Sequence, residues 1–99
     1  MSQTMGTKDK IYARLKKELS PQYLHIVDES TRHAGHSEAK TSGGGHYEVI
    51  IVSTRFQKMT LLRRHRMIYK SLRDNLLQKE IHALKIQAFT PQEWKEKPS

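Results

Sequence analysis

The segment Thr60 to Leu77, TLLRRHRMIYKSLRDNLL, limits the possible folds most, because its apolar residues recur with a helical period. At about 100° per residue, one stripe collects several of them, and two more lie beside it. The stripe contains Leu61, His65, Ile68, Leu72 and Leu76, flanked by Leu62 and Tyr69. The pattern predicts a helix that lies on a sheet through this arc and that bends or stops near Asp74-Asn75.

The opposite side of this predicted helix is basic, with Arg63, Arg66, Lys70 and Arg73. Ordinary solvation accounts for such a face, and contact with nucleic-acid phosphates is the alternative. His65 interrupts the apolar stripe. We expect a half-buried, hydrogen-bonded imidazole there in preference to a metal ligand or a catalytic base.

Length and composition indicate one small domain with an acidic partner. The 99 residues include 18 Lys or Arg against 10 Asp or Glu, a formal net charge of +8, and no cysteine. The charge favours nucleic acid, an anionic lipid surface or an acidic protein. The lack of cysteine excludes a disulfide, a thiol nucleophile or a thiolate ligand from this chain. Without an apolar run near ~20 residues or a secretion signal, we expect a cytoplasmic protein outside the membrane.

The N-terminal part of the chain predicts one helix before the first strand. We expect a disordered tail over residues 1–6, a single domain over 7–96 and a frayed end over 97–99. Apolar residues recur every four positions from Ile11 to Leu19, which predicts a helix over 8–19 with Thr7 as its N-cap. Ser20-Pro21 ends that helix, because a residue before proline disfavours the helical conformation.

Three segments rich in β-formers predict strands over 23–28, 46–53 and 81–89. The first two flank a long polar loop, 29–45, that closes on three glycines, and they should pair antiparallel. The second and third are joined through a helix and should be parallel with a right-handed crossover. A short helix is expected over 76–80, and Thr90-Pro91-Gln92-Glu93 predicts a capping box for a last helix. The order α-β-β-α-(α)-β-α describes a two-layer α+β domain, a three-stranded mixed sheet with helices on one face.

Histidine is the one enriched residue with metal chemistry, with six in the chain. His33 and His36 form an HxxH in the long loop, a weak zinc signal because a closed site needs four ligands. His82 is expected at the head of the apolar face shared by Leu84, Ile86 and Ala88. It is either a hydrogen-bonded histidine at a strand end or, with the loop, part of an incomplete metal site. No GxSxG, P-loop, HExxH or GxGxxG is present, so we expect no enzyme.

Four stretches resemble the BolA protein family in order and spacing, and the resemblance runs from about Ile11 to Trp94. They are VDESTRHAG (27–35), GHYEVIIVSTRF (45–56), RHRMIYKSL (64–72) and IHALKIQAFTPQEW (81–94). The resemblance implies a class II KH-like fold with an extra terminal helix, in agreement with the predicted order. The chain lacks the GxxG loop with which KH domains clamp RNA. The family often has glycine in the turn after Arg55-Phe56, where this chain has Gln57-Lys58.

The resemblance also implies a function, as a non-enzymatic adaptor in iron–sulfur cluster assembly or trafficking. Such a protein shares a [2Fe-2S] cluster with a monothiol glutaredoxin, which supplies a cysteine while glutathione supplies another thiolate. The ligands implied here are His82 and His33, with His36 as the alternative loop ligand. Alone, the chain is expected to hold no cluster and to be a monomer or weak homodimer. The family's link to transcription, stress and cell shape implies an alternative, a DNA-binding regulator that uses Arg63, Arg66, Lys70 and Arg73.

Overall fold

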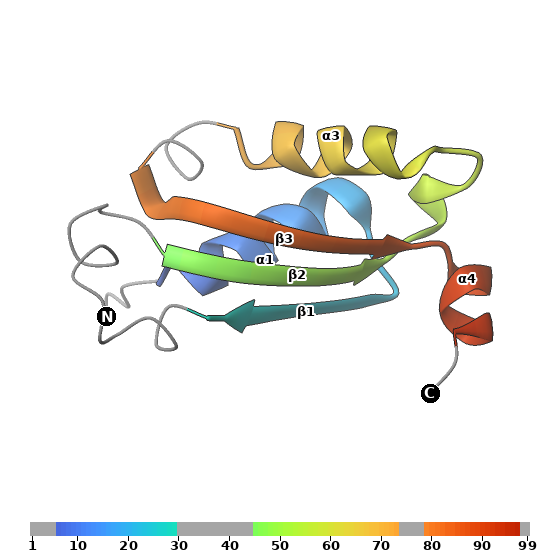
Figure 1. The fold of residues 1–99 in the computed structure, drawn as a ribbon, viewed down its shortest axis with the longest axis horizontal. Helices are drawn as coiled ribbons and strands as arrows, with labels where there is room; N and C mark the ends of the chain where they lie inside the picture. Colours follow the sequence, from blue (N-terminus) through green and yellow to red (C-terminus); the bar gives the residue numbers. More distant parts are fainter. Residues whose placement is uncertain (1–5, 30–44, 74–78, 98–99) are drawn as a thin grey trace.

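A computed structural model describes residues 6–29, 45–73 and 79–97, and its centre is a three-stranded sheet (Figure 1). The strands are β1 (Tyr23–Asp28), β2 (Gly45–Val52) and β3 (Ile81–Phe89), in the order β1-β2-β3. β2 pairs antiparallel with β1 and parallel with β3. Both predicted pairings are confirmed, and β2 is the central strand.

The helices complete a two-layer α+β fold. α1 (Thr7–Leu19) and α3 (Leu61–Ser71) lie side by side on one face of the sheet, and the 3₁₀ turn η2 (Thr54–Phe56) connects β2 to α3. α4 (Pro91–Glu96) follows β3 at one end of the sheet. None of the helices formed by the described residues is long and apolar enough to cross a membrane. The short helix predicted over 76–80 lies mostly outside the described residues.

The core lies between the sheet and the two long helices. Alternate residues of β2 face the helices, which is the side-chain period of a half-buried strand. Every layer contributes fully buried hydrophobic side chains, among them Ile11, Leu15, Val49, Ile51, Phe56, Ile68 and Leu72. Each contributes roughly 1.5–3 kcal/mol by leaving water. Among the residues that the structure describes, no long helix covers the other face of the sheet.

The N-terminal cap of α1 differs from the prediction. Gly6 is the N-cap, without a side-chain hydrogen bond, and Thr7 is the first helical residue. The Thr7 hydroxyl instead donates to Glu80 Oε1 at 2.8 Å, so it ties the start of α1 to the segment before β3. The helix ends as predicted: Ser20 has φ 45°, and its N–H donates to the Lys16 carbonyl.

α3 buries a narrower arc than the apolar pattern predicts. Ile68 and Leu72 are buried, as expected, and His65 is half-buried. Leu61 and Leu62 are 64% and 58% exposed, so their predicted place in the core is wrong. Leu61 is the first helical residue, and Leu62, like the exposed Tyr69, lies on the solvent flank. Leu76 lies outside the described residues.

α3 buries an arginine, Arg64, which the apolar pattern did not include. Arg64 donates from Nε to the Met59 carbonyl at 3.1 Å and from Nη1 to the Ala88 carbonyl at 3.0 Å. Its Nη1 and Nη2 also reach the two carboxylate oxygens of Glu93, at 2.6 and 3.1 Å. A guanidinium is tolerated in a protein interior when its donors are satisfied in this way. Hydrogen bonding from Arg64 lowers the pKa of Glu93 to about 2.

The predicted capping box of α4 is confirmed. The Thr90 hydroxyl accepts from the Glu93 N–H, and the Glu93 carboxylate accepts from the Thr90 N–H. The cap directs Trp94 against the end of the sheet, where its ring stacks on Tyr23 at 5.1 Å and lies 5.3 Å from Phe89.

The turn between η2 and α3 contains a backbone conformation that glycine favours. Lys58 has φ 64°, in the left-handed region that glycine adopts most readily. A residue with a Cβ costs roughly 1–2 kcal/mol there.

Candidate functional site

His82 lies on the face of the sheet opposite the helices, and a β-bulge places it there. β2 pairs Gly45 with Ile81 and then His46 with Ala83, so His82 is an extra residue in β3. Ile81 is therefore in the core, and so is Ala88, although the two have opposite sequence parity. The prediction that His82 shares the apolar face of Ala88 is wrong, because the bulge reverses the alternation between them. The His82 side chain is exposed.

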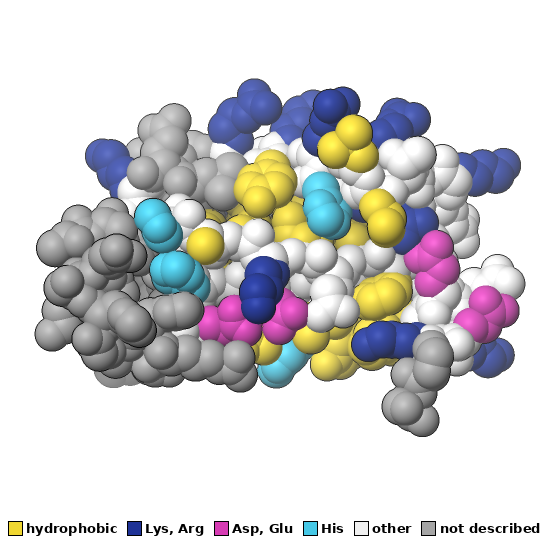
Figure 2. All heavy atoms as spheres, in the orientation of Figure 1, with side chains coloured by type: hydrophobic (Ala, Val, Ile, Leu, Met, Phe, Trp, Pro, Cys, Tyr) yellow, Lys and Arg dark blue, Asp and Glu magenta, His cyan; other side chains and the backbone are white. Residues whose placement is uncertain are grey.

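His46 lies beside His82. The two ring centroids are 5.2 Å apart, with an angle of 45° between the ring planes. His46 precedes the buried Tyr47, so it faces the side of the sheet opposite the core, and Figure 2 shows histidine side chains together at this end. Its carbonyl accepts from the Glu29 N–H at 2.7 Å, which joins it to the residue after β1. No sequence pattern indicates this pair, because only the parallel register of β2 and β3 brings the two histidines together.

The other predicted ligands cannot be placed in the same way. His33 and His36 lie outside the described residues, so their role stays a prediction. Within the described residues, no group of three or more His, Cys, Asp or Glu side chains could hold a metal ion. His46 and His82 therefore offer two imidazoles, fewer than the three or four protein ligands of ordinary zinc sites.

Acidic and basic side chains on this face are engaged with one another. Lys85 Nζ lies 3.6 Å from Glu29 Oε1, and the Glu29 side chain is only 10% exposed. Further along the sheet, Gln87 donates to Glu48 at 2.7 Å. Lys85, Glu29 and Glu48 thus each have a partner within the described residues.

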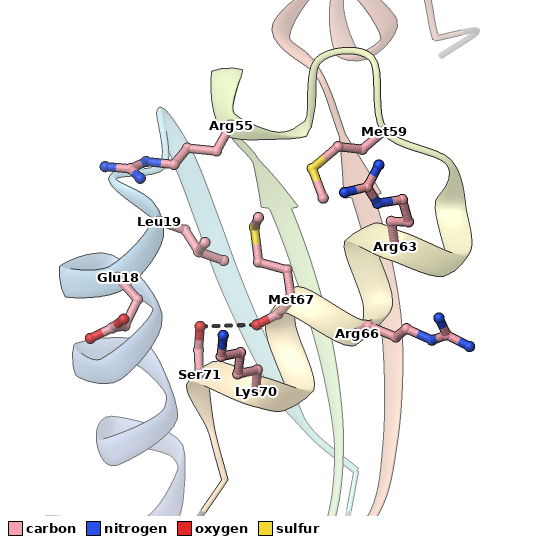
Figure 3. A pocket seen from close by; sticks show the side chains of 9 residues that line it. All are labelled: Glu18, Leu19, Arg55, Met59, Arg63, Arg66, Met67, Lys70 and Ser71. Atoms are coloured by element: carbon pink, nitrogen blue, oxygen red, sulfur yellow. Dashed lines mark hydrogen bonds between the residues drawn. The ribbon is translucent and has the colours of Figure 1, made fainter.

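A basic groove lies at the other end of β2, between α1 and α3 (Figure 3). Its volume is about 490 Å³, and its apolar part is formed by Leu19, Met59 and Met67. The basic residues that line it are Arg55, Arg63, Arg66 and Lys70, with Glu18 and Ser71 from the two helices. In Figure 3 the Arg66 side chain extends away from α1.

Three of the four predicted nucleic-acid contacts therefore line one groove. Arg73 is exposed and does not line it, whereas Arg55, which no pattern singled out, does. Arg55 belongs to η2, after the end of β2, whereas His46 stands near its start. At ~3.3 Å per residue the groove and the histidine pair are about 20 Å apart along β2, so one ligand of ordinary size does not reach both.

A family model for BolA-like proteins matches residues 15–93. BolA-like protein 1 of Mus musculus is 41% identical over 88 residues, which cover 89% of this chain and 61% of that protein. SufE-like protein 1, chloroplastic/mitochondrial, of Arabidopsis thaliana is 43% identical over 88 residues, 85% of this chain but 24% of that protein. The chain thus spans less than two thirds of these two relatives.

A bacterial relative is matched over more of its length. The DNA-binding transcriptional regulator BolA of Escherichia coli (strain K12) is 36% identical over 90 residues, 91% of this chain and 81% of that protein. Among solved structures, BolA1 from Arabidopsis thaliana has a TM-score of 0.75 at 36% identity, covering 96% of this chain and all of that one. The BolA domain of SufE1 from the same plant has a TM-score of 0.75 at 40% identity, covering 92% and 99%.

Proposed function

This chain belongs to the BolA-like protein family, and on that basis we propose that it is a non-enzymatic adaptor in iron–sulfur cluster assembly or trafficking. Its cargo is a [2Fe-2S] cluster that it shares with a monothiol glutaredoxin and glutathione. The observation that carries the proposal is the exposed imidazole of His82, held by a strand at an open end of the sheet. A relative named SufE-like protein 1 contains a BolA domain, which supports a connection with iron–sulfur metabolism.

The donor set of this chain fits such a shared cluster. Imidazole is a good ligand for iron, and the chain has no cysteine, so every thiolate must come from the partner and glutathione. His82 is the first ligand, and His33 is the second, with His36 as the alternative. Histidines on one iron and thiolates on the other are the ligand types of a Rieske-like centre, whose potential is higher than that of an all-thiolate cluster. Because the site is incomplete alone, the isolated chain holds no cluster, as a monomer or weak homodimer.

The test uses the purified full chain, glutathione and a cluster-loaded monothiol glutaredoxin. Visible absorption and circular dichroism should shift towards mixed histidine and cysteine ligation when the chain is added. His82→Gln should abolish the shift, whereas His25→Gln should retain it. His25 is an exposed histidine of β1, paired with Ile50, about 13 Å along β2 from His46, so it is a matched control. His33→Gln and His36→Gln then identify the loop ligand. A His82→Gln variant with an intact shift would exclude this ligand assignment.

The basic groove supports a second candidate function, as a DNA-binding regulator. Arg55, Arg63, Arg66 and Lys70 put four cations around one groove, and cations held in one place attract phosphates more strongly than scattered ones. A relative from Escherichia coli is named a DNA-binding transcriptional regulator. The two functions use different parts of the surface, so one does not exclude the other.

Duplex binding measured by fluorescence anisotropy over a range of salt concentrations tests this alternative. Affinity should fall with a log–log slope of roughly −0.9 for each phosphate contact. Arg63→Ala with Arg66→Ala should weaken binding and reduce the slope by about 2. The control changes the same charge elsewhere, with Lys8→Ala and Lys95→Ala, both exposed and outside the groove. Equal losses in the two double variants would show that only net charge matters and would remove the groove from the proposal.

A further inference from the structure

We propose that His46 and His82 form a preorganised two-imidazole site that binds one divalent transition-metal ion, such as Zn²⁺, in the chain by itself. This goes beyond the proposed function, because it assigns a ligand role to His46 and requires neither an iron–sulfur cluster nor a partner protein.

The β-bulge is the first observation behind this proposal. In a regular strand, His82 would point to the same side as Leu84 and Ala88, towards the helices. The extra residue in β3 turns it to the opposite side, where the ring meets His46. A bulge leaves its strand with an unpaired residue, and bulges often re-aim a side chain at a functional site. Here the bulge brings together two side chains that can bind metals, and it adds no residue to the core.

The distance between the rings is the second observation. A Zn–N bond of about 2.0–2.1 Å, plus roughly 1.1 Å from nitrogen to ring centre, puts each centroid about 3.2 Å from the ion. Two such vectors at a tetrahedral angle place the centroids about 5.2 Å apart. The observed separation of His46 and His82 is 5.2 Å. The separation of the two rings is therefore the one that a single ion between them would need.

The backbone around both histidines is held in place, which is the third observation. β2 is paired on both sides, and His46 itself is paired with Ala83 of β3. The hydrogen bond from the Glu29 N–H to its carbonyl adds to this support. Because the entropy of bringing two ligands together has already been lost in folding, the second imidazole binds as an intramolecular ligand.

The chemistry of the ligands selects the class of ion. Neutral imidazole suits Zn²⁺, Ni²⁺ and Cu²⁺, whereas Mg²⁺ and Ca²⁺ prefer oxygen ligands. Two protein ligands leave open positions on the ion for water or for a ligand from another molecule. The site is therefore an exchangeable one and not a structural zinc site on which folding depends.

The experiment titrates the full chain with Zn²⁺ alone, by calorimetry and by NMR of the imidazole nitrogens. One ion should bind, the nitrogen signals of His46 and His82 should shift together, and Mg²⁺ should have no effect. Loss of one of two chelating ligands should weaken binding about 100-fold, so His46→Gln and His82→Gln should each do so. The controls His25→Gln and His65→Gln should bind as the original chain does. Circular dichroism establishes that each variant is folded.

Several outcomes would overturn the proposal. Binding that survives His46→Gln, or that disappears only with His33→Gln or His36→Gln, would place the ion on other histidines. No binding of Zn²⁺ at millimolar concentration would also reject it. The zinc titration contains no glutaredoxin, so its failure is distinct from failure of the cluster assay. Zinc binding without cluster sharing would support the two-imidazole site and reject the proposed function.

Discussion

Replacing Glu93 with glutamine should destabilise the protein by removing the charge opposite a buried guanidinium. The Arg64 side chain is 6% exposed, whereas that of Glu93 is 46% exposed. A fall in the Glu93 pKa from 4.5 to about 2 sets an upper bound of roughly 3 kcal/mol. Water around the half-exposed carboxylate screens the pair, so we expect a loss of about 1–2 kcal/mol at pH 7. Glutamine still fits a capping box, so the cap of α4 is retained.

The pH dependence separates this charge effect from a packing effect. A carboxylate with a lowered pKa stabilises the folded state fully above the unfolded pKa of about 4.5. That contribution disappears as the pH falls towards 2, where Glu93 takes up a proton in the folded protein. The difference in stability between the original chain and Glu93→Gln should therefore shrink over this interval.

Urea unfolding between pH 7 and pH 3 measures that difference. Trp94, the only tryptophan, reports fluorescence from the same helix, and far-UV circular dichroism reports the whole fold. Coincident transitions would justify a two-state treatment. Glu96→Gln, an exposed carboxylate on α4, is the control and should change little. The same loss of stability at pH 7 and pH 3, or no loss at either, would refute the charge argument.

Four further substitutions test the packing and the backbone, each by urea unfolding. Ile68→Ala should lower the free energy of unfolding by about 2–5 kcal/mol, because Ile68 is fully buried. Leu61→Gln should change it by no more than about 0.5 kcal/mol, because Leu61 is exposed. Similar losses in the two variants would contradict the observed orientation of α3. Ser53→Ala should cost about 1–3 kcal/mol, because its buried hydroxyl donates to the Leu19 carbonyl at 2.7 Å; an unchanged midpoint would show that this carbonyl finds another donor. Lys58→Gly should raise the free energy of unfolding by about 0.5–1 kcal/mol, because glycine adopts the left-handed conformation of this position without strain. A lower free energy of unfolding would show that Lys58 is not strained.

Local pattern was sufficient for most elements of the fold. The strands over 23–28 and 81–89 have the predicted bounds, and the middle strand differs by one residue at each end. The capping box at Thr90 was also recognisable, because its two hydrogen bonds join residues three apart. The strand bounds and the capping box depend on residues close together in the sequence, so the sequence is enough to predict them.

The orientation of α3 depended on more distant groups. Arg64 is buried because acceptors from Met59, Ala88 and Glu93 converge on it. The helical period of the apolar residues does not predict where such acceptors lie. The apolar stripe predicted Ile68 and Leu72 correctly, but it could not show that Leu61 and Leu62 lie beside water. The family resemblance predicted the fold and singled out His82, yet it did not indicate the direction of its side chain.

The sequence alone thus determined the order of elements, the sheet topology and the residue types available for metal or phosphate binding. These follow from periodicity, β-branched runs, capping residues and the count of histidines and cations. Tertiary structure decided which of those residues meet. The bulge in β3 and the register of β2 against β3 bring His46 to His82, and the packing of α1 against α3 forms the groove that both Arg55 and Arg63 line. The physical reason is that alternation and helical period describe one element, whereas register and packing are settled between elements.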